Sequence, residues 1–496
     1  MYPNSINDKE NDYSLQSRLF GHRMKDNQTL YEYLIEFLQV MISPKEVTGM
    51  SKPYKEDYFP IDDLIEKRGL SFSPVTRIGL KRFVFLPKSK LESKAEVDEQ
   101  AYNDCIIALK ESMLLDSSLQ FDKDFYVNVL QNLLLGFKAV NQNRSWFDQN
   151  LLPICCEVIL PESMGLKRKR KDITYRPDQA KVDNEFSYDR YTYMRRGGEV
   201  YYLHLLQSLQ QNPGYKDSLE EKFQNLVNQF PQFSMLTTFI QLTWERRLTI
   251  DPHEKKLVTK VLGAIPQGFA KKGKYTLTEL DNFLDTAIHP FEKIDILSYG
   301  IILQILRMMY LEASEIAGAG DSVWIIDVNE KGFENKEVRK LAINGFDSNE
   351  ECINTALHKG FVAYKSDLIR KPSDNEFDII KKAAADTFKL YRKLGKTIGL
   401  VIPPKGMGIR FSLSEKVIKF LVLAIIPPNG KVTLDTFINK LYEHYGMIID
   451  RVQYNLEMHK GNVQHLNNLS FLESNKDAFA QKLKDCGFLR DFDYSR

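Results

Sequence analysis

The sequence predicts a mainly α-helical protein of several domains, with small β elements and a winged-helix-like domain at the C-terminus. Three observations lead to this prediction. The chain has 496 residues, more than one hydrophobic core usually supports. Apolar residues recur at helical spacing along most of its length, and strand-like stretches are few and short. A content of 43% hydrophobic and 27% charged residues excludes a mostly disordered chain, a collagen-like chain and a coiled-coil rod.

Helical periodicity is clear from the N-terminal part onward. The segment 28–41 places apolar residues at intervals of three and four, namely Leu30, Leu34, Phe37, Leu38 and Met41. Asp122 is a plausible N-cap, and Thr276 precedes Glu279 by three residues, which fits a capping box. We expect further helices at 99–115, 122–138, 198–210, 216–230, 233–247, 252–262, 276–286, 290–313 and 376–394.

Strands and domain boundaries are expected at a few places only. Short β-branched and aromatic runs predict strands at Lys81–Leu86, Val323–Val328, Thr397–Ile402 and Ile409–Leu413. The polar, charged stretch 161–197 reads as a basic loop or linker. It would separate an N-terminal helical domain (1–160) from a central helical domain (198–313). A small mixed connecting region (314–375) would then lead to the C-terminal domain (376–496).

The C-terminal part carries the most specific architectural pattern. Ser414 opens an apolar helix that ends at a Pro-Pro turn, Thr433 caps a second helix that ends at Gly446, and Asp450 caps a third; a fourth is expected at 474–485. Three short helices with tight turns and a strand-like end are typical of a winged helix, whose third helix reads nucleic acid. The exposed positions of that helix would include Arg451, Gln453, Asn455 and Lys460. A purely structural or partner-binding role fits the same pattern.

Basic residues are concentrated locally, since the formal net charge is only +2. The densest run is Lys167, Arg168, Lys169, Arg170 and Lys171, which could neutralise several phosphates or form a solvated loop. Arg190, Arg195 and Arg196 alternate with tyrosines, a composition suited to stacking on unpaired bases. The helix that begins at the next two glycines could bind an anion at its N-terminus. Lys405 and Arg410 flank a predicted hairpin loop and could also contact nucleic acid.

Catalytic motifs are not found. None of the eight histidines forms a metal-hydrolase motif, and there is no P-loop and no nucleophile elbow. We therefore expect no catalytic residue, no metal site and no cofactor. The alternative is a metal-dependent nuclease with a non-local active site, for which Asp327, followed by Glu330 and Lys331, is the nearest candidate.

Three stretches resemble a family: GHRMKDNQTLYEYLIEFL at 21–38, MRRGGEVYYLHL at 194–205, and the segment 395–446 that begins GKTIGLVIPPKG. Together they resemble accessory subunits of multi-gene bacterial anti-phage defence systems, which are encoded beside ATPases or nucleases. The resemblance implies a subunit of a DNA-directed defence assembly, with DNA and the other subunits as partners, and transfers no catalytic residue.

These observations predict a non-catalytic, DNA-associated or scaffolding subunit, with a pure protein–protein adaptor as a further alternative. The first thirty residues are polar, and the longest apolar run, 420–426, is far shorter than the roughly 20 residues that a membrane span requires. We therefore expect a cytoplasmic protein with no membrane partner.

Overall fold

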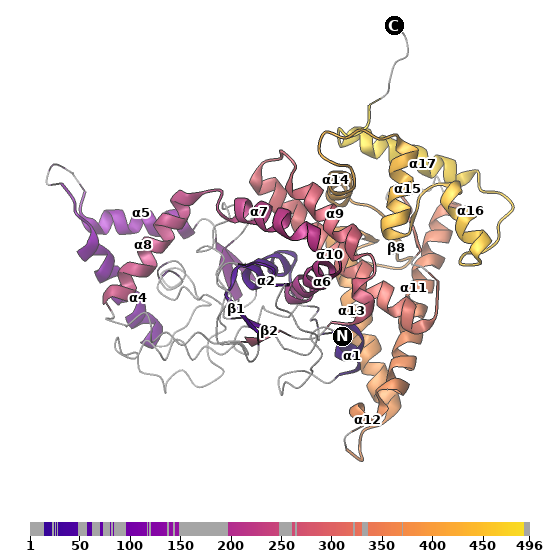
Figure 1. Cartoon of the computed structure of the whole chain (residues 1–496), viewed down its shortest axis with the longest axis horizontal. Helices are drawn as coiled ribbons and strands as arrows, with labels where there is room; N and C mark the ends of the chain where they lie inside the picture. Colours follow the sequence, from indigo (N-terminus) through magenta and orange to yellow (C-terminus); the bar gives the residue numbers. More distant parts are fainter. Residues whose placement is uncertain are drawn as a thin grey trace, which may run out of the picture.

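A computed structural model gives the architecture (Figure 1). It describes residues 14–21, 28–47, 57–61, 70–72, 96–116, 121–135, 138–141, 144–147, 197–247, 260–262, 265–320, 323–329, 336–369 and 371–490, with the single residues 24, 26, 80, 83 and 118 between them.

The described chain is mainly α-helical, as the sequence predicts. Its α-helices are α1 (Leu15–Phe20), α2 (Leu30–Ile42), α4 (Glu96–Ser112), α5 (Lys123–Leu135), α6 (Gly197–Gln211), α7 (Lys216–Val227), α8 (Pro231–Arg247), α9 (Gly273–Leu284), α10 (Pro290–Ala317), α11 (Lys336–Ala363), α12 (Lys365–Leu368), α13 (Glu376–Ile398), α14 (Glu415–Ile425), α15 (Leu434–Tyr445), α16 (Arg451–Lys460) and α17 (Phe471–Asp485). Two 3₁₀ helices are η5 (Pro213–Tyr215) and η7 (Gln267–Ala270). The strands are β1 (Lys45–Val47), β2 (Leu70–Phe72), β3 (Lys138–Asn141), β4 (Arg144–Phe147), β5 (Lys260–Val261), β6 (Trp324–Ile325), β7 (Val401–Ile402), β8 (Arg410–Phe411) and β9 (Met447–Ile448).

Helix α10 lies at the centre of the hydrophobic core and packs against α2, α11, α13 and α14. His289 accepts a hydrogen bond from the Phe291 amide at its start, and Pro290 occupies the first turn, so the predicted start is confirmed. By length and composition α10 could cross a membrane, but 89% of its most apolar window is buried inside the protein. Its apolarity therefore follows from its place in the core.

One hydrophobic cluster runs through the predicted N-terminal, central and C-terminal domains. It includes side chains from Leu15 in α1 to Leu483 in α17. The interval 314–375 is not a small connecting region, because it holds the 28-residue helix α11, which packs on α10 and α13. The predicted domains thus share one core. Helices α4, α5 and α8 lie outside this cluster and form one end of the molecule (Figure 1).

Short strands tie the C-terminal helices to the rest of the chain. Strand β9 pairs in parallel with β6, and β7 pairs antiparallel with β8. The Asp327 amide donates to the Phe411 carbonyl at 2.9 Å, which joins the two pairs. Asn475 of α17 is buried and donates to the carbonyls of Ile326 and Ile449, both at 2.9 Å. The C-terminal helices are therefore anchored to the segment 323–328.

The predicted caps of the C-terminal helices are confirmed. Ser414, Thr433 and Asp450 each accept a backbone hydrogen bond at the start of α14, α15 and α16, and Gly446 ends α15 with a φ of 70°. A winged helix is not confirmed. After α16 the chain forms α17, and Phe488 and Leu489 belong to no strand.

Other local predictions differ from the structure. Thr397 and Ile398 end α13 instead of beginning a strand. The described residues of the predicted helix 252–262 include β5, which pairs antiparallel with β2. Phe83, the one described residue of the predicted strand 81–86, is helical. These segments are short, and long-range packing decides their conformation.

Candidate functional site

Most of the predicted nucleic-acid-binding residues lie outside the described part of the chain. These are Lys167, Arg168, Lys169, Arg170, Lys171, Arg190, Arg195 and Arg196. The predicted anion site at the start of α6 is already occupied, because Gly197 and Gly198 are buried against α2. Their amides donate to Gln28 Oε1 at 3.3 Å and Glu36 Oε2 at 2.7 Å. The helix N-terminus thus holds a carboxylate of the protein itself.

The two basic residues of the β7–β8 hairpin have different environments. Lys405 is exposed in the loop. Arg410 is only 6% exposed, and its Nε donates to Asp327 Oδ2 at 2.6 Å. The prediction that Arg410 contacts nucleic acid is therefore wrong, because its guanidinium is held inside the protein by a carboxylate.

The third helix of the predicted winged-helix unit, α16, presents fewer polar groups than expected. Gln453 is buried and donates to Asn439 Oδ1 at 2.8 Å, so its predicted exposure is wrong. Arg451 pairs with Glu473 at 2.8 Å, and Lys460 pairs with Glu457 at 2.8 Å. Asn455 is half-buried. Both cations thus have acidic partners, and nucleic-acid contact by Arg451, Asn455 and Lys460 stays a prediction.

Asp327 does not have the environment of a metal ligand. Arg410 occupies its Oδ2, Arg339 Nε lies 3.8 Å from the same atom, and Oδ1 accepts from the Asn329 amide at 3.2 Å. Glu330 and Lys331 lie outside the described residues. Within the described ranges no cluster of His, Cys, Asp and Glu has the arrangement of a metal site. The observed role of Asp327 is an ion pair that joins the β6 segment to β8.

A basic stripe on α13 was missed in the sequence because it is spread over four turns. Residues 381–396 contain six basic residues and one acidic residue. Lys382, Lys389, Lys393 and Lys396 share one helix face at intervals of seven, four and three, and the first three are exposed. Lys389 pairs with Asp26 at 3.0 Å. This stripe is a local cationic surface in a nearly neutral protein.

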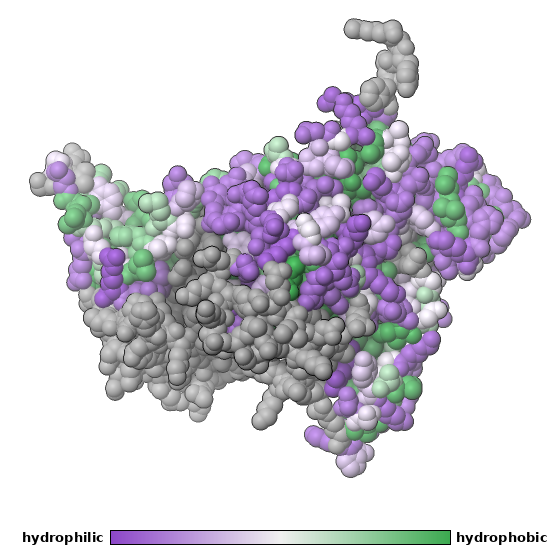
Figure 2. Space-filling view, viewed as in Figure 1, coloured by the Kyte–Doolittle hydropathy of each residue, from purple (hydrophilic) through white to green (hydrophobic). Residues whose placement is uncertain are grey.

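An apolar surface lies at the opposite end of the molecule, on α5 and α8. Figure 2 shows hydrophobic side chains gathered there. On α5 and just before it, exposed apolar residues recur every four positions and form what we term the α5 stripe: Phe121, Phe125, Val129 and Leu133. On α8 the exposed apolar residues are Met235, Phe239 and Leu242. Spacings of three and four on exposed faces are those of a helix-packing surface without a partner.

Acidic groups border the α5 stripe. Residues 110–124 contain the acids Glu111, Asp116, Asp122 and Asp124 against two lysines, a formal charge of −2. Lys110 pairs with Asp124, and Lys123 donates to the Lys110 carbonyl at 2.6 Å. The Asp122 carboxylate caps α5 through the Phe125 amide at 2.8 Å, as predicted. The apolar stripe therefore has an acidic border.

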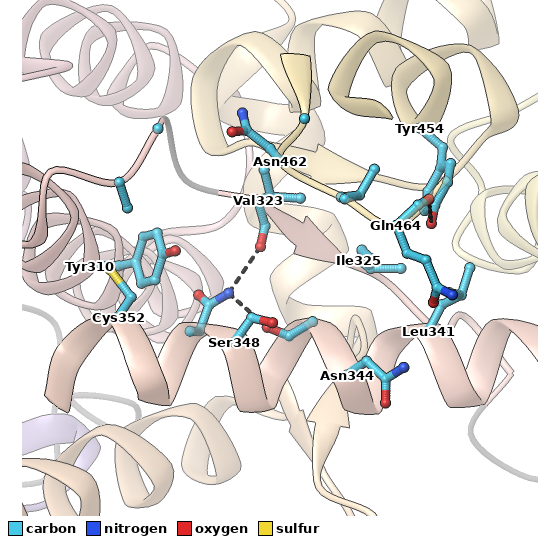
Figure 3. Close-up of a pocket in the computed structure, with 16 residues that line it drawn as sticks. Tyr310, Val323, Ile325, Leu341, Asn344, Ser348, Cys352, Tyr454, Asn462 and Gln464 are labelled. Atoms are coloured by element: carbon cyan, nitrogen blue, oxygen red, sulfur yellow. Dashed lines mark hydrogen bonds between the residues drawn. The ribbon is translucent and has the colours of Figure 1, made fainter. Parts of the chain in front are cut away.

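A pocket of about 590 Å³ lies between α11, the β6 segment and the loop after α16 (Figure 3). Its walls carry the aromatic rings of Tyr310 and Tyr454 and aliphatic side chains. Amide and hydroxyl groups surround these walls: Asn344, Ser348, Asn349, Asn462 and Gln464. No Asp, Glu, Lys or Arg is among the described residues that line it. The described lining thus offers both polar and apolar contacts to a small molecule.

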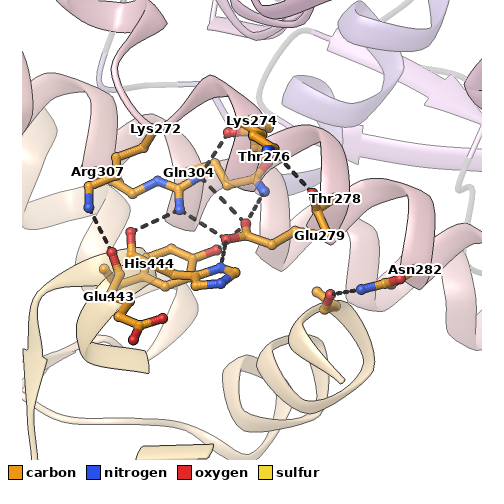
Figure 4. Close-up of polar contacts among 12 residues, drawn as sticks. Lys272, Lys274, Thr276, Thr278, Glu279, Asn282, Gln304, Arg307, Glu443 and His444 are labelled. Carbon is orange, nitrogen blue, oxygen red and sulfur yellow. Dashed lines mark hydrogen bonds and ion pairs between the residues drawn. The ribbon is translucent and has the colours of Figure 1, made fainter. Parts of the chain in front are cut away.

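An extensive polar cluster is buried where α6, α9, α10 and α15 meet (Figure 4). Arg307 Nη1 lies 3.0 Å from Glu279 Oε1, and Arg307 Nη2 donates to Thr276 Oγ1 at 2.8 Å. His444 Nδ1 lies 2.7 Å from Glu279 Oε1, and Tyr445 donates to Oε2 at 2.6 Å. Thr276 and Glu279 are therefore members of a buried network inside α9 and form no capping box.

The network keeps Glu279 ionised. Burial alone would raise the pKa of its carboxyl, but the Arg307 charge and the bonds from His444 and Tyr445 lower it to about 2. His204 lies 2.8 Å from Thr276 on the other side, and burial lowers the pKa of its ring to about 3, so that it stays neutral. All these groups are shielded from solvent, so the cluster holds helices together and offers no access to a substrate.

A second buried carboxylate, Glu312, lies near the C-terminal end of α10. Glu312 accepts from the Gly268 amide of η7, while its Oε2 accepts no hydrogen bond from the described residues. Burial, followed by the charge of Glu315, raises the pKa of Glu312 to about 7. Lys271 offsets part of this effect. Glu312 is thus a group whose ionisation opposes the folded state.

Comparison with protein-family models, with curated proteins and with solved structures gives no match. The resemblance to defence-system accessory subunits stays a prediction, and the site is interpreted from its own geometry.

We expect Glu279→Gln to lower the free energy of unfolding by about 3–5 kcal/mol, because Arg307 would remain buried without its counter-charge. Urea denaturation at pH 7 measures this loss. Glu292→Gln is the control, since Glu292 forms an exposed pair with Lys419 that is worth at most about 1 kcal/mol. Equal losses in the two variants would contradict a structural role for the network, and Glu279→Leu/Arg307→Met should recover much of the lost stability.

Glu312→Gln should stabilise the protein above pH 7 and have little effect near pH 4. In the folded protein the Glu312 pKa is about 7 against an ordinary value of 4.5, so ionisation costs folding free energy as the pH rises between these values. The full gain above pH 7 is at most about 3 kcal/mol, since one pKa unit corresponds to roughly 1.4 kcal/mol. Thermal melts of both proteins at pH 4 and pH 8 measure the difference, and a gain independent of pH would refute the assignment.

Proposed function

We propose that this protein is a non-catalytic scaffolding subunit that binds a partner protein through the α5 stripe. The observation that carries this proposal is the unpartnered apolar face of α5. Four side chains at successive turns, Phe121, Phe125, Val129 and Leu133, are exposed there although helix-packing faces are normally buried. The Phe121 and Phe125 rings stack with centroids 4.1 Å apart, which makes the stripe a pre-arranged aromatic anchor.

The chemistry of the stripe indicates its occupant. Apolar residues at every fourth position pack best against an amphipathic helix. The acidic border, with a formal charge of −2 over 110–124, favours a helix flanked by Lys or Arg. We therefore infer that the partner offers an amphipathic helix with a basic border. The sequence resemblance suggests that this partner is an ATPase or nuclease subunit of a cytoplasmic bacterial defence complex.

Contact with DNA is a second function of the same subunit. The observation that favours it is the lysine stripe on α13, together with the basic run of residues 167–171 in the sequence. Such groups bind phosphates through charge and release counterions, so the contact would not depend on base sequence. The α5 stripe and the lysine stripe on α13 lie on different elements. One subunit can thus hold a protein partner and DNA together.

We expect Phe125→Glu/Val129→Glu to abolish partner binding without lowering the melting temperature, since both side chains are already exposed. The test is co-expression of the full chain with each product of the genes adjacent to its own, followed by affinity purification. Met407→Glu, in the exposed β7–β8 loop, is the matched control and should leave the complex intact.

Two results would overturn the scaffolding proposal. One is equal recovery of the gene-neighbour product with the Phe125→Glu/Val129→Glu variant. The other is a chain that is a dimer by light scattering and becomes a monomer in that variant, because the stripe would then bind a second copy.

The DNA contact predicts a salt-dependent affinity for duplex DNA that falls on removal of basic residues. Alanine at Lys382 and Lys393, or at all five positions 167–171, should lower the affinity for DNA. It should also lower the slope of log Kd against log salt, and this slope should fall by about one for each phosphate that is no longer neutralised. Fluorescence anisotropy with a labelled duplex and a labelled single strand measures both quantities. Lys274→Ala/Lys431→Ala is the control, because these two lysines lie outside both basic segments. Unchanged slopes in the two test variants would contradict the proposed contact with DNA.

A further inference from the structure

We propose that Glu312 and Glu315 share one proton against Gly268, and that loss of this proton releases the 3₁₀ helix η7 from α10. This pH-sensitive contact lies at the C-terminal end of α10 and is independent of the α5 stripe and of DNA. Three observations support it: a buried carboxyl oxygen without a partner, a second carboxyl group beside it, and a glycine that lets both approach the backbone of η7.

The unpartnered oxygen belongs to Glu312, which is 9% exposed. The carboxyl group accepts a hydrogen bond from the Gly268 amide of η7. Its Oε2 is closed to solvent and has no hydrogen-bond partner among the described residues. An ionised carboxylate buried in this way is costly, whereas a protonated one donates its own O–H to a neighbouring acceptor. Oε2 is therefore the atom on which we place the proton.

Glu315, one turn further along α10, supplies the acceptor. A side chain at Gly268 would begin 2.1 Å from Glu312 Oε2 and 2.7 Å from Glu315 Oε2, so both oxygens lie against the same glycine. Lys271 Nζ lies 3.2 Å from Glu315 Oε2, and both of these side chains are about half exposed. Because Glu315 is exposed and paired with a cation while Glu312 is buried, Glu315 is the carboxylate of the pair and Glu312 carries the proton.

Gly268 makes this approach possible. A larger residue at this position would place its first side-chain atom against both carboxyl groups. The next residue of η7, Phe269, is fully buried, and the Lys271 amide closes the 3₁₀ turn by donating to the Gly268 carbonyl at 3.0 Å. The carboxyl pair is therefore in direct contact with the backbone of η7, and a change in its charge acts on that turn.

The charged groups around the pair set the pH at which the proton is lost. Burial, followed by the charge of Glu315, raises the pKa of Glu312 to about 7. Lys271 and the charge of the chain's amino terminus act in the opposite direction. On α11, which packs along α10, Lys359 donates to the Ala317 carbonyl at 2.7 Å, beyond the pair. The proton is consequently lost to solvent near neutral pH.

Loss of the proton favours an open form in which η7 is detached from α10. In that form water reaches Glu312, and its pKa returns to the ordinary value of 4.5. The open form therefore gains over the closed form as the pH rises from 4.5 to about 7, and the gain is complete above pH 7. Because η7 leads through Lys272 into α9, the opening loosens the start of the helix that carries Glu279.

The test is hydrogen–deuterium exchange of the full chain at pH 5 and pH 8, read by mass spectrometry on the peptide that covers η7. After division by the intrinsic exchange rates, the protection of η7 should fall between these values, by at most about 70-fold, because one pKa unit corresponds to a tenfold change in the opening equilibrium. Helix α17, which does not pack on η7, is the internal reference and should keep its protection.

Three variants distinguish a shared proton from the burial of a single acid. Glu312→Gln removes the site of the proton and should abolish the fall in protection. Glu315→Gln removes the neighbouring charge, so the fall should shrink by about twofold or more, whereas Lys271→Gln removes the counter-charge, so the fall should grow by a similar factor. Glu292→Gln, at the exposed start of α10, is the matched control and should behave as the wild type does.

Protection of η7 that does not change with pH in the wild type would overturn the proposal, as would an unchanged fall in Glu312→Gln. A fall that Glu315→Gln leaves unaltered would indicate a lone buried acid and no shared proton. Shifts in the same direction for Glu315→Gln and Lys271→Gln would contradict the pair as well. None of these residues belongs to the α5 stripe or to the basic segments, so the outcome is independent of the proposed partner and DNA contacts.

Discussion

The buried ion pair between Glu279 and Arg307 is the constraint on which the arrangement of the helices depends. Each of its polar atoms has to be satisfied away from water, and the partners come from α6, α9, α10 and α15. Tyr201 of α6 reaches it through Gln304, with bonds of 2.5 Å and 2.7 Å. Displacement of any of these helices would leave a buried charge or dipole unpaired. The network thus favours one register of packing, which apolar contacts alone would specify less strictly.

The C-terminal helices depend on the same central framework. The backbone after α15 continues into β9, which pairs with β6, and Asn475 bonds to carbonyls of both segments. Arg410, which the sequence suggests as a surface cation, neutralises Asp327 within this framework. These contacts tie the region to the rest of the fold. Two of the side chains expected to contact DNA, Arg410 and Gln453, are buried and hold this region in place.

The sequence predicts helices well where the signal is local. Ser414, Thr433 and Asp450 act as the expected caps, because a cap depends on only three or four neighbouring residues. Predictions that depend on distant residues fail. The Thr276 and Glu279 spacing matches a capping box by composition, but only the position of Arg307 in the folded chain shows that both are buried. Helix α11 was missed for the same reason, since its Asn- and Asp-rich sequence resembles a loop, while its apolar residues pack on α10 and α13.

The candidate sites, too, are visible in the sequence only where they depend on neighbouring residues. The α5 stripe was present in the sequence as a regular apolar helix, but periodicity cannot tell an exposed face from a buried one, and this distinction is what makes it a binding surface. The pocket has no sequence signal at all, because its polar groups come from α11 and from the loop after α16, more than a hundred residues apart. Since α11 is held by the core and α16 by its contacts with β9 and α15, the two walls of the pocket are fixed before any ligand arrives. A molecule that enters such a pocket does not have to order the chain around it.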